Sequence, residues 1–293
     1  MKRLLLAMIC FIAVSLIALP AAAQCPANPL SLIDGQTWVY QTAESDFLTS
    51  GSSTIGRFTA SIVGVTAATP NGRGALTVTQ TLVDTGTSGT PTVTRLATAS
   101  GRYIVYPDCS GGELMFMLGG YAVQYEFVFL GGFTEMYLVS DSLLPLHNAS
   151  TQYGTAKLSA APACPAGTAP LNYLGGTTWS FHAESPFWFT AGPVGAASVG
   201  IFKPTVGTDK NGNPIGVLAI SETLNTANGA VTRLAGATGR YTVYPDCSGG
   251  ELFFNLGHQW VQFEYVLINA NEMYMLTDSW ADGLVMAGHA KRY

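Results

Sequence analysis

The stretch GRYIVYPDCSGGEL, residues 101–114, returns at residues 239–252 as GRYTVYPDCSGGEL, with Thr242 in place of Ile104 as the single change. The similarity extends to both sides of this motif, and Arg95 aligns with Arg233 in the same register. Further matched pairs are 37–47 with 178–187, 123–129 with 261–267, 135–142 with 272–279, and 154–157 with 288–291. A period of this length is too long for a solenoid repeat and indicates two modules in tandem. We place them at 24–160 and 161–293.

The first 23 residues have the pattern of a secretory signal peptide. Lys2 and Arg3 are cationic, an apolar run extends to Leu19, and small residues lead up to Ala23. We therefore expect cleavage after Ala23, a secreted or periplasmic protein, and no transmembrane span after signal removal. The alternatives are an uncleaved membrane anchor, for which the apolar run is short, and a lipoprotein attached at Cys25.

The composition excludes two classes of protein. Hydrophobic residues make up 48% of the chain, so it is predicted to be globular and not disordered. Charged residues make up only 11%, the net charge is −5, and Lys and Arg do not cluster. Nucleic acid is therefore excluded as a partner, because its binding requires groups of cationic side chains at the phosphates.

The cysteines that follow the signal peptide divide equally between the modules. Each module has one near its start, Cys25 or Cys164, and one in the repeated motif, Cys109 or Cys247. An even number in an exported chain predicts disulfides. Cys25–Cys109 and Cys164–Cys247 is the pairing that lets each module fold alone. The competing use, a zinc site, requires closely spaced pairs that are absent here, and we predict no metal and no cofactor.

Short segments of alternating polarity predict strands throughout each module. In ALTVTQTL (75–82), for example, Leu76, Val78 and Leu82 share one face. The nine segments expected in the first module are 37–42, 56–65, 75–83, 92–98, 101–106, 113–118, 122–130, 134–140 and 151–158. Asn71-Gly72 and Asn211-Gly212 favour hairpins with type I′ turns.

Eight or nine such strands in about 120 residues predict an all-β fold: a small antiparallel up-and-down barrel in each module, which closes to remove its sheet edges. A β-sandwich is the structural alternative. An outer-membrane barrel is rejected on three grounds: each module is small, the final strand of the chain, GHAKRY, lacks an apolar outward stripe, and two such barrels with internal disulfides in one chain would be unusual.

The repeated motif resembles the G-x-Y-x-V-x-x-D-C-x-G-x-L signature of secreted bacterial proteins of unknown function with calycin-like or allene-oxide-cyclase-like β-barrels. This resemblance implies a barrel and an extracytoplasmic location. It carries no cyclase activity over, because no catalytic residue of that enzyme can be matched here.

The residues of the motif predict a hairpin with a covalent anchor. Pro107 fixes φ and ends the preceding strand. Asp108 is expected to accept a hydrogen bond from the backbone two residues on. Gly111 and Gly112 are expected to supply the positive φ angles of the reversal.

Duplication offers a test for catalytic residues, because a site shared by both modules appears twice. The histidines fail it: His182, His258 and His289 align with Gln41, Gly120 and Thr155, and His147 has no counterpart. A common Ser-His-Asp arrangement is therefore not expected, and we predict no catalytic residue. The polar pairs that are duplicated within strands are Arg95/Arg233, Glu126/Glu264, Asp141/Asp278 and Gln80/Glu222.

Two of these pairs give a ligand hypothesis. Arg95 with Glu126, and Arg233 with Glu264, would line the barrel interiors and orient a small apolar ligand. Gln80 and Glu222 share a face with leucines and would also point inward. The alternative is that these residues are solvent-facing or form structural ion pairs.

The expected function is that of an exported, non-enzymatic protein that binds a small apolar molecule or a surface partner. A structural or adhesive component of the cell envelope is the alternative, suited to bivalent contact, and a cyclase-like or isomerase-like enzyme is a third hypothesis. An open apolar barrel interior would favour ligand binding, whereas an interior filled by side chains would favour the structural role.

Overall fold

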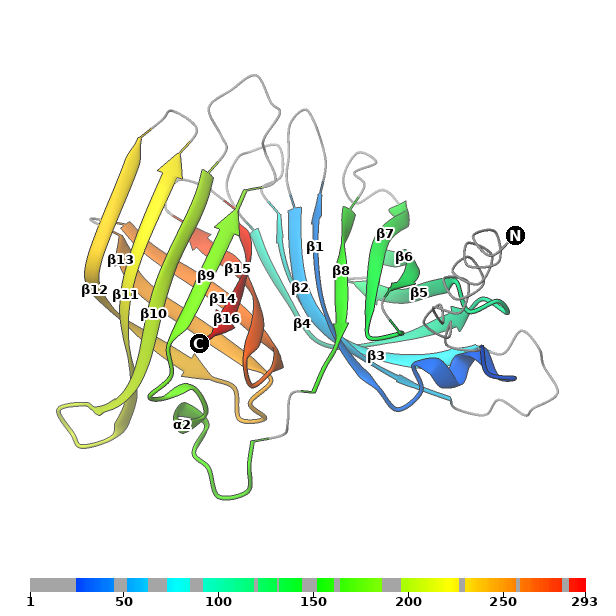
Figure 1. Ribbon diagram of the computed structural model, residues 1–293, viewed down its shortest axis with the longest axis horizontal. Helices are drawn as coiled ribbons and strands as arrows, with labels where there is room; N and C mark the ends of the chain where they lie inside the picture. The colour runs from blue at the N-terminus through cyan, green and yellow to red at the C-terminus, as the bar shows by residue number, and fades with distance from the viewer. Residues whose placement is uncertain are drawn as a thin grey trace, which may run out of the picture.

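The protein consists of two closed antiparallel β-barrels of eight strands each, which lie side by side (Figure 1). The computed structural model describes residues 25–44, 52–62, 73–84, 92–118, 121–130, 132–143, 152–160, 164–185, 196–226, 230–256, 259–280 and 285–293. The predicted fold class is confirmed, and the sandwich alternative is wrong. The signal peptide, the Asn71-Gly72 turn, His147 and His258 lie outside the described residues.

In the first barrel the strands follow one another around the sheet in sequence order. They are preceded by a short 3-10 helix, η1 (Pro29–Leu32). The strands are β1 (Thr37–Glu44), β2 (Ser52–Ser61), β3 (Gly74–Asp84), β4 (Thr92–Val105), β5 (Gly111–Leu118), β6 (Tyr121–Leu130), β7 (Glu135–Leu143) and β8 (Gln152–Leu158). Pairing of β8 with β1 closes the barrel. The predicted strands 92–98 and 101–106 are one strand, because β4 continues past an irregularity in its pairing with β3.

The second barrel repeats this order after a short helix, α2 (Pro170–Leu174). Its strands are β9 (Trp179–Glu184), β10 (Ala196–Thr208), β11 (Pro214–Thr226), β12 (Val231–Val243), β13 (Gly249–Leu256), β14 (Gln259–Asn269), β15 (Glu272–Trp280) and β16 (Ala287–Arg292). Here β16 pairs with β9. Neither of the two helices within the described residues has the length and apolar character that crossing a membrane requires.

Apolar and aromatic side chains fill the interior of both barrels. Trp38 stacks on Phe58 with ring centroids 6.3 Å apart, and their counterparts Trp179 and Phe202 stack at 6.0 Å. The inward positions of the remaining strands complete two separate cores. Of the two interiors that the sequence left open, these filled cores are the one that favours the structural role.

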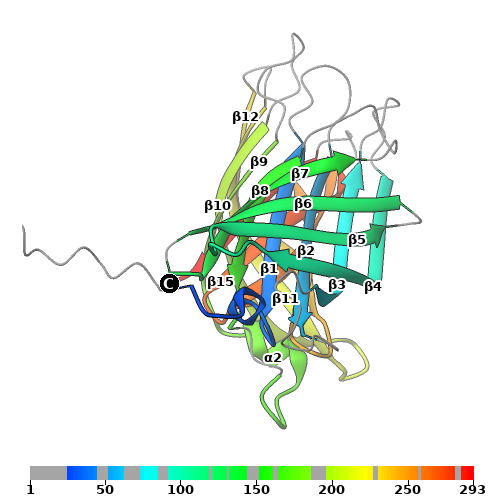
Figure 2. The same cartoon turned by 90° about the vertical axis from the view of Figure 1, so that its right-hand side faces the viewer.

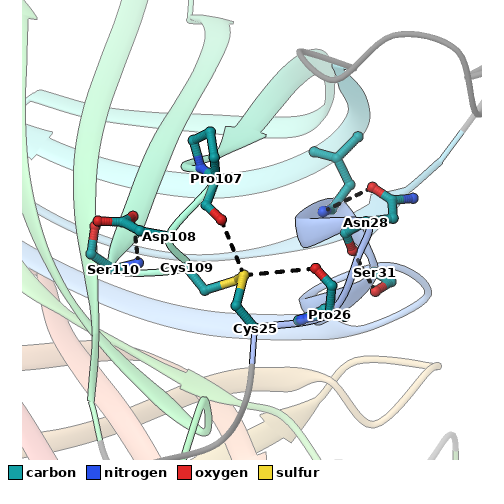
Figure 3. The surroundings of a disulfide bond; sticks show 9 residues. Cys25, Pro26, Asn28, Ser31, Pro107, Asp108, Cys109 and Ser110 are labelled. Atoms are coloured by element: carbon teal, nitrogen blue, oxygen red, sulfur yellow. Dashed lines mark hydrogen bonds between the residues drawn. A yellow bond between two sulfur atoms is a disulfide. The ribbon is translucent and has the colours of Figure 1, made fainter.

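A disulfide in each barrel joins the repeated motif to the segment that precedes the first strand, as the sequence predicts. Cys25–Cys109 and Cys164–Cys247 are the disulfides, with Cα atoms 5.6 and 5.0 Å apart. Beside the first (Figure 3), the Asp108 carboxylate accepts hydrogen bonds from the backbone N–H of Ser110 at 3.0 Å and from its hydroxyl at 2.7 Å. The disulfide thus joins the N-terminal segment to a turn that its own aspartate orders.

The explanation predicted for the two glycines of the motif is wrong. The left-handed residue of the turn is Cys109, with φ 58°, whereas Gly111 and Gly112 belong to β5. A Cβ on Gly111 would lie 1.9 Å from the carbonyl oxygen of Phe127 on β6. Glycine is needed here because two backbones approach closely, and not because the chain reverses.

The hairpin between β10 and β11 is present, but its turn is not type I′. Gly212 has φ 83°, and Asn211 does not have a positive φ. The Asp209 carboxylate accepts hydrogen bonds from the backbone N–H groups of Asn211 and Asn213, both at 2.8 Å. An ordered loop around Asp209 therefore replaces the two-residue turn.

The outer surfaces of the two barrels pack against each other, with β1, β2 and β3 of the first against β14 and β15 of the second. Val39, Ile55 and Val83 of the first barrel are buried in this contact. They meet a set from the second barrel that consists of Val266, Ile268, Tyr274, Leu276 and Val285. The contact has its own apolar core, distinct from the two barrel interiors.

Candidate functional site

A cleft of about 620 Å³ lies where the two barrels meet. The first barrel lines it with the outer faces of β2, β3 and β4, and the second with β14 and the repeated motif. The lining residues are Ile55, Gly56, Arg57, Thr59, Thr77, Thr79, Gln80, Thr81 and Arg95 on one side, and Tyr244, Asp246, Ser248, Glu264 and Val266 on the other. The cleft therefore exists only in the docked pair.

An ion pair between the barrels forms one wall of the cleft. Arg95 Nε donates to Glu264 at 3.1 Å, and Arg95 Nη2 lies 3.3 Å from Glu251. The Glu264 carboxylate is buried and accepts two further hydrogen bonds, from Thr81 Oγ1 at 2.7 Å and from Tyr244 Oη at 2.8 Å. A buried carboxylate needs such partners, because its desolvation is otherwise costly.

The structure corrects the predicted grouping of the four candidate binding residues. Arg95 pairs with Glu264 of the other module, and not with Glu126. Glu126 lies on the outer face of β6, since Tyr125 and Phe127 on either side of it are buried in the core. It accepts a hydrogen bond from Tyr106 at 3.2 Å, and Arg233 is exposed on β12. None of the four lines a barrel interior.

Three charged or aromatic residues that line the cleft, Arg57, Tyr244 and Asp246, were not among the predicted binding residues. Arg57 Nη1 lies 3.4 Å from Asp246 Oδ2, a second ion pair between the barrels. Burial, and then the charge of Glu264, raise the pKa of the Tyr244 hydroxyl, so it stays protonated and donates. Tyr244 and Asp246 belong to the repeated motif, so the repeat could have indicated that they matter. No sequence pattern indicated that the other barrel would contact this motif.

The prediction that Gln80 and Glu222 point inward is confirmed. Tyr40 donates a hydrogen bond to Gln80 inside the first barrel, and Ser198 donates one to Glu222 inside the second. Burial raises the pKa of the Glu222 carboxyl, and the hydrogen bond from Ser198 only partly offsets this. The side chains of Asp141 and Asp278 are not among those that the structure describes.

Comparison with known proteins adds little to this description of the site. No protein-family model matches the chain, and no curated protein matches it. One similar solved structure is that of a protein of unknown function of the DUF3598 family from Nostoc punctiforme. It is 13% identical, the match covers 91% of this chain and 97% of that one, and the TM-score is 0.24.

The cleft offers binding groups of three kinds: two arginines, the carboxylates of Asp246 and Glu264 that pair with them, and the hydroxyls of threonine, serine and tyrosine. Within the part of the chain that the structure describes, no cluster of three or more His, Cys, Asp or Glu side chains could hold a metal ion. These groups could hydrogen-bond to a molecule bound in the cleft.

A second polar cluster joins the barrels at Glu272. Its Oε1 accepts from Lys157 Nζ of the first barrel at 2.6 Å and from His289 Nε2 at 2.6 Å. Burial would raise the pKa of the Glu272 carboxyl, but the hydrogen bond and charge of Lys157, with those of His289, outweigh it. The pKa therefore lies below its usual 4.5.

This cluster makes the docked pair sensitive to acid. A carboxyl whose pKa is lowered by folding stabilises the native state above its unfolded pKa, and that contribution disappears as the pH falls through the folded pKa. Glu272→Gln should therefore lower the free energy of unfolding by about 1.5–3 kcal/mol at pH 7, and by much less at pH 3. Urea unfolding at both pH values measures this difference.

The matched control is Glu135→Gln, at the equivalent position of the first barrel. Its carboxylate is half exposed and 3.7 Å from Lys157, so the change should stay within about 0.5 kcal/mol. Equal effects of the two substitutions, or a Glu272→Gln effect of the same size at both pH values, would contradict the assignment.

Proposed function

We propose that the protein is an exported, non-enzymatic binding protein that holds a small polar, hydroxyl-bearing molecule in the cleft between its barrels. The observation that carries this proposal is the cleft itself, of about 620 Å³, a volume typical of small-molecule sites, which often lie at domain interfaces. Thr59, Thr77 and Thr79 place hydroxyls along one wall, and Arg57 and Arg95 add donors.

This ligand class replaces the small apolar molecule expected from the sequence. The barrel interiors, where that ligand was expected, are occupied by packed side chains. A polar ligand would form hydrogen bonds with the paired charged side chains that line the cleft. The few groups that converge there would orient the ligand.

The disulfides support the exported location, because such bonds persist in oxidising compartments. The signal-peptide pattern of residues 1–23 supports it as well. The relationship to calycin-like barrel proteins is part of the same proposal and rests on the repeated motif together with the eight-stranded closed barrels.

A structural or adhesive role in the cell envelope is the second candidate, and the filled barrel interiors favour it. A cyclase-like or isomerase-like activity has less support. The buried acid of the cleft, Glu264, already accepts hydrogen bonds from Arg95, Thr81 and Tyr244. A substrate would have to displace one of these donors to reach the carboxylate.

Native mass spectrometry of the protein purified from its own source tests the binding proposal. We expect a co-purified small molecule that is lost from Thr77→Trp, because the indole would occupy the cleft from an exposed strand position. Thr238→Trp, an exposed threonine on β12 outside the cleft, should retain it. A source-purified protein with the mass of the polypeptide alone, or a ligand retained by Thr77→Trp, would refute the proposal.

A further inference from the structure

The contact between the barrels joins two different faces. The first barrel uses β1 to β4, whereas the second uses β14 and β15, which correspond to β6 and β7 of the first. A contact between unlike faces of two similar units leaves one copy of each face unused. The unused faces are β6–β7 of the first barrel and β10–β12 of the second.

The unused face of the first barrel exposes side chains equivalent to those that its counterpart buries. Val128, Tyr137 and Val139 are exposed, while the equivalent Val266, Tyr274 and Leu276 are buried; for the tyrosines the exposed fractions are 59% and 3%. The register is also the same. Val128 pairs with Tyr137 and Glu126 with Val139, as Val266 pairs with Tyr274 and Glu264 with Leu276.

The unused face of the second barrel repeats the other half of the contact. Val199 is 57% exposed, whereas the equivalent Ile55 is 0% exposed. Val231 and Ile201 are exposed beside it. The strands are again in matching register: Val199 pairs with Thr223 and Thr223 with Arg233, as Ile55 pairs with Thr81 and Thr81 with Arg95.

The charges of the two unused faces are complementary. Arg233 on one is the counterpart of Arg95, and Glu126 on the other is the counterpart of Glu264, the two residues that pair across the barrels at 3.1 Å. The two carboxylates also accept a hydrogen bond from equivalent tyrosines: Tyr106 donates to Glu126 at 3.2 Å, and Tyr244 donates to Glu264 at 2.8 Å.

We propose that a second copy of this chain docks head to tail, so that β10–β12 of one molecule pack on β6–β7 of the next and Arg233 pairs with Glu126. The two faces lie at opposite ends of the molecule: β10, β11 and β12 form the left margin of Figure 1, and β5, β6 and β7 face the viewer in Figure 2. Such an unlike contact forms open chains or rings and not a closed two-fold dimer.

The contact between molecules is weaker than the one within the chain. Val39 and Val83, which are buried in the existing contact, correspond to Ser180 on β9, next to the unused face, and to Asn225 on that face. The covalent connection between the barrels also raises their effective concentration, a gain that separate molecules lack. We expect a dissociation constant between about 1 μM and 1 mM.

Charge reversal tests the proposal in the full chain. Sedimentation velocity from micromolar to millimolar protein should show wild type growing beyond dimers, while Arg233→Glu and Glu126→Arg alone each weaken association at least about tenfold. An equimolar mixture of the two variants should associate again, because each then meets an opposite charge at both ends. Lys210→Glu, in the loop between β10 and β11, is the matched control and should behave as wild type.

Each outcome of this experiment either supports the head-to-tail contact or contradicts it. A wild type that stays monomeric at 1 mM, one that stops at dimers, or a mixture that fails to recover association would overturn the proposal. Loss of folding in a variant would appear in its thermal unfolding, and a mixture that associates again shows that both variants are folded. The result does not depend on the cleft ligand, because all four proteins keep Arg95 and Glu264.

Discussion

Replacing Cys25 and Cys109 together by serine is expected to lower the free energy of unfolding of the first barrel by about 4–5 kcal/mol in the chain-entropy model. The disulfide closes a loop of 84 residues, so its loss releases a large number of unfolded conformations. A small domain has a total stability of about 5–15 kcal/mol, and the variant barrel should therefore open at low urea concentration.

The second disulfide is the matched comparison, because Cys164 and Cys247 are separated by 83 residues. The corresponding double serine variant should lose a similar free energy from the second barrel. Hydrogen exchange measured on peptides from β3 and from β11 assigns each loss to its barrel. Urea midpoints that match wild type in either double variant would be incompatible with this role of the disulfides.

Trp179→Ala is expected to cost about 3–5 kcal/mol, as large-to-small substitutions of buried aromatic residues do. Trp179 is fully buried, stacks on Phe202, and donates from Nε1 to Thr177 Oγ1 at 2.7 Å. The counterpart Trp38→Ala should cost a similar amount. Thermal or urea unfolding measures both values.

Phenylalanine at the same positions separates burial from hydrogen bonding. The Nε1–H of Trp38 is buried and has no partner among the described residues, so Trp38→Phe should cost less than Trp179→Phe, which also loses a hydrogen bond. Trp260→Ala is the surface control, because this side chain is 66% exposed, and its effect should stay within about 0.5 kcal/mol. Equal costs for all three alanine variants would show that these tryptophans do not form the cores.

The chemistry of the cleft arises from residues with different local roles. Asp246 orders its own turn by accepting hydrogen bonds from Ser248, and the same carboxylate faces Arg57 of the other barrel. Its counterpart Asp108 orders the equivalent turn. The motif therefore has a structural role in both barrels and gains a second role only where the other barrel contacts it.

The sequence by itself determined the duplication, the disulfide pairing and the all-β class, because these follow from the repeat and from local alternation, and it favoured closed barrels over a sandwich. Alternation along 75–82 places Leu76 and Val78 in the core, and one cysteine near the start of each module can reach the cysteine of its own motif. The type of turn at Asn211 and the reason for Gly111 were not determined, since both depend on how neighbouring backbones approach.

Only the tertiary structure decided which outer faces are buried. Glu126 and Glu264 have nearly the same neighbours in sequence, yet one is half-buried beside Tyr106 and the other lies in the contact between the barrels. No local pattern distinguishes them, because docking of two barrels depends on the summed complementarity of residues from many strands. For the same reason, pairing of Arg95 with the other module could not be predicted from the repeat.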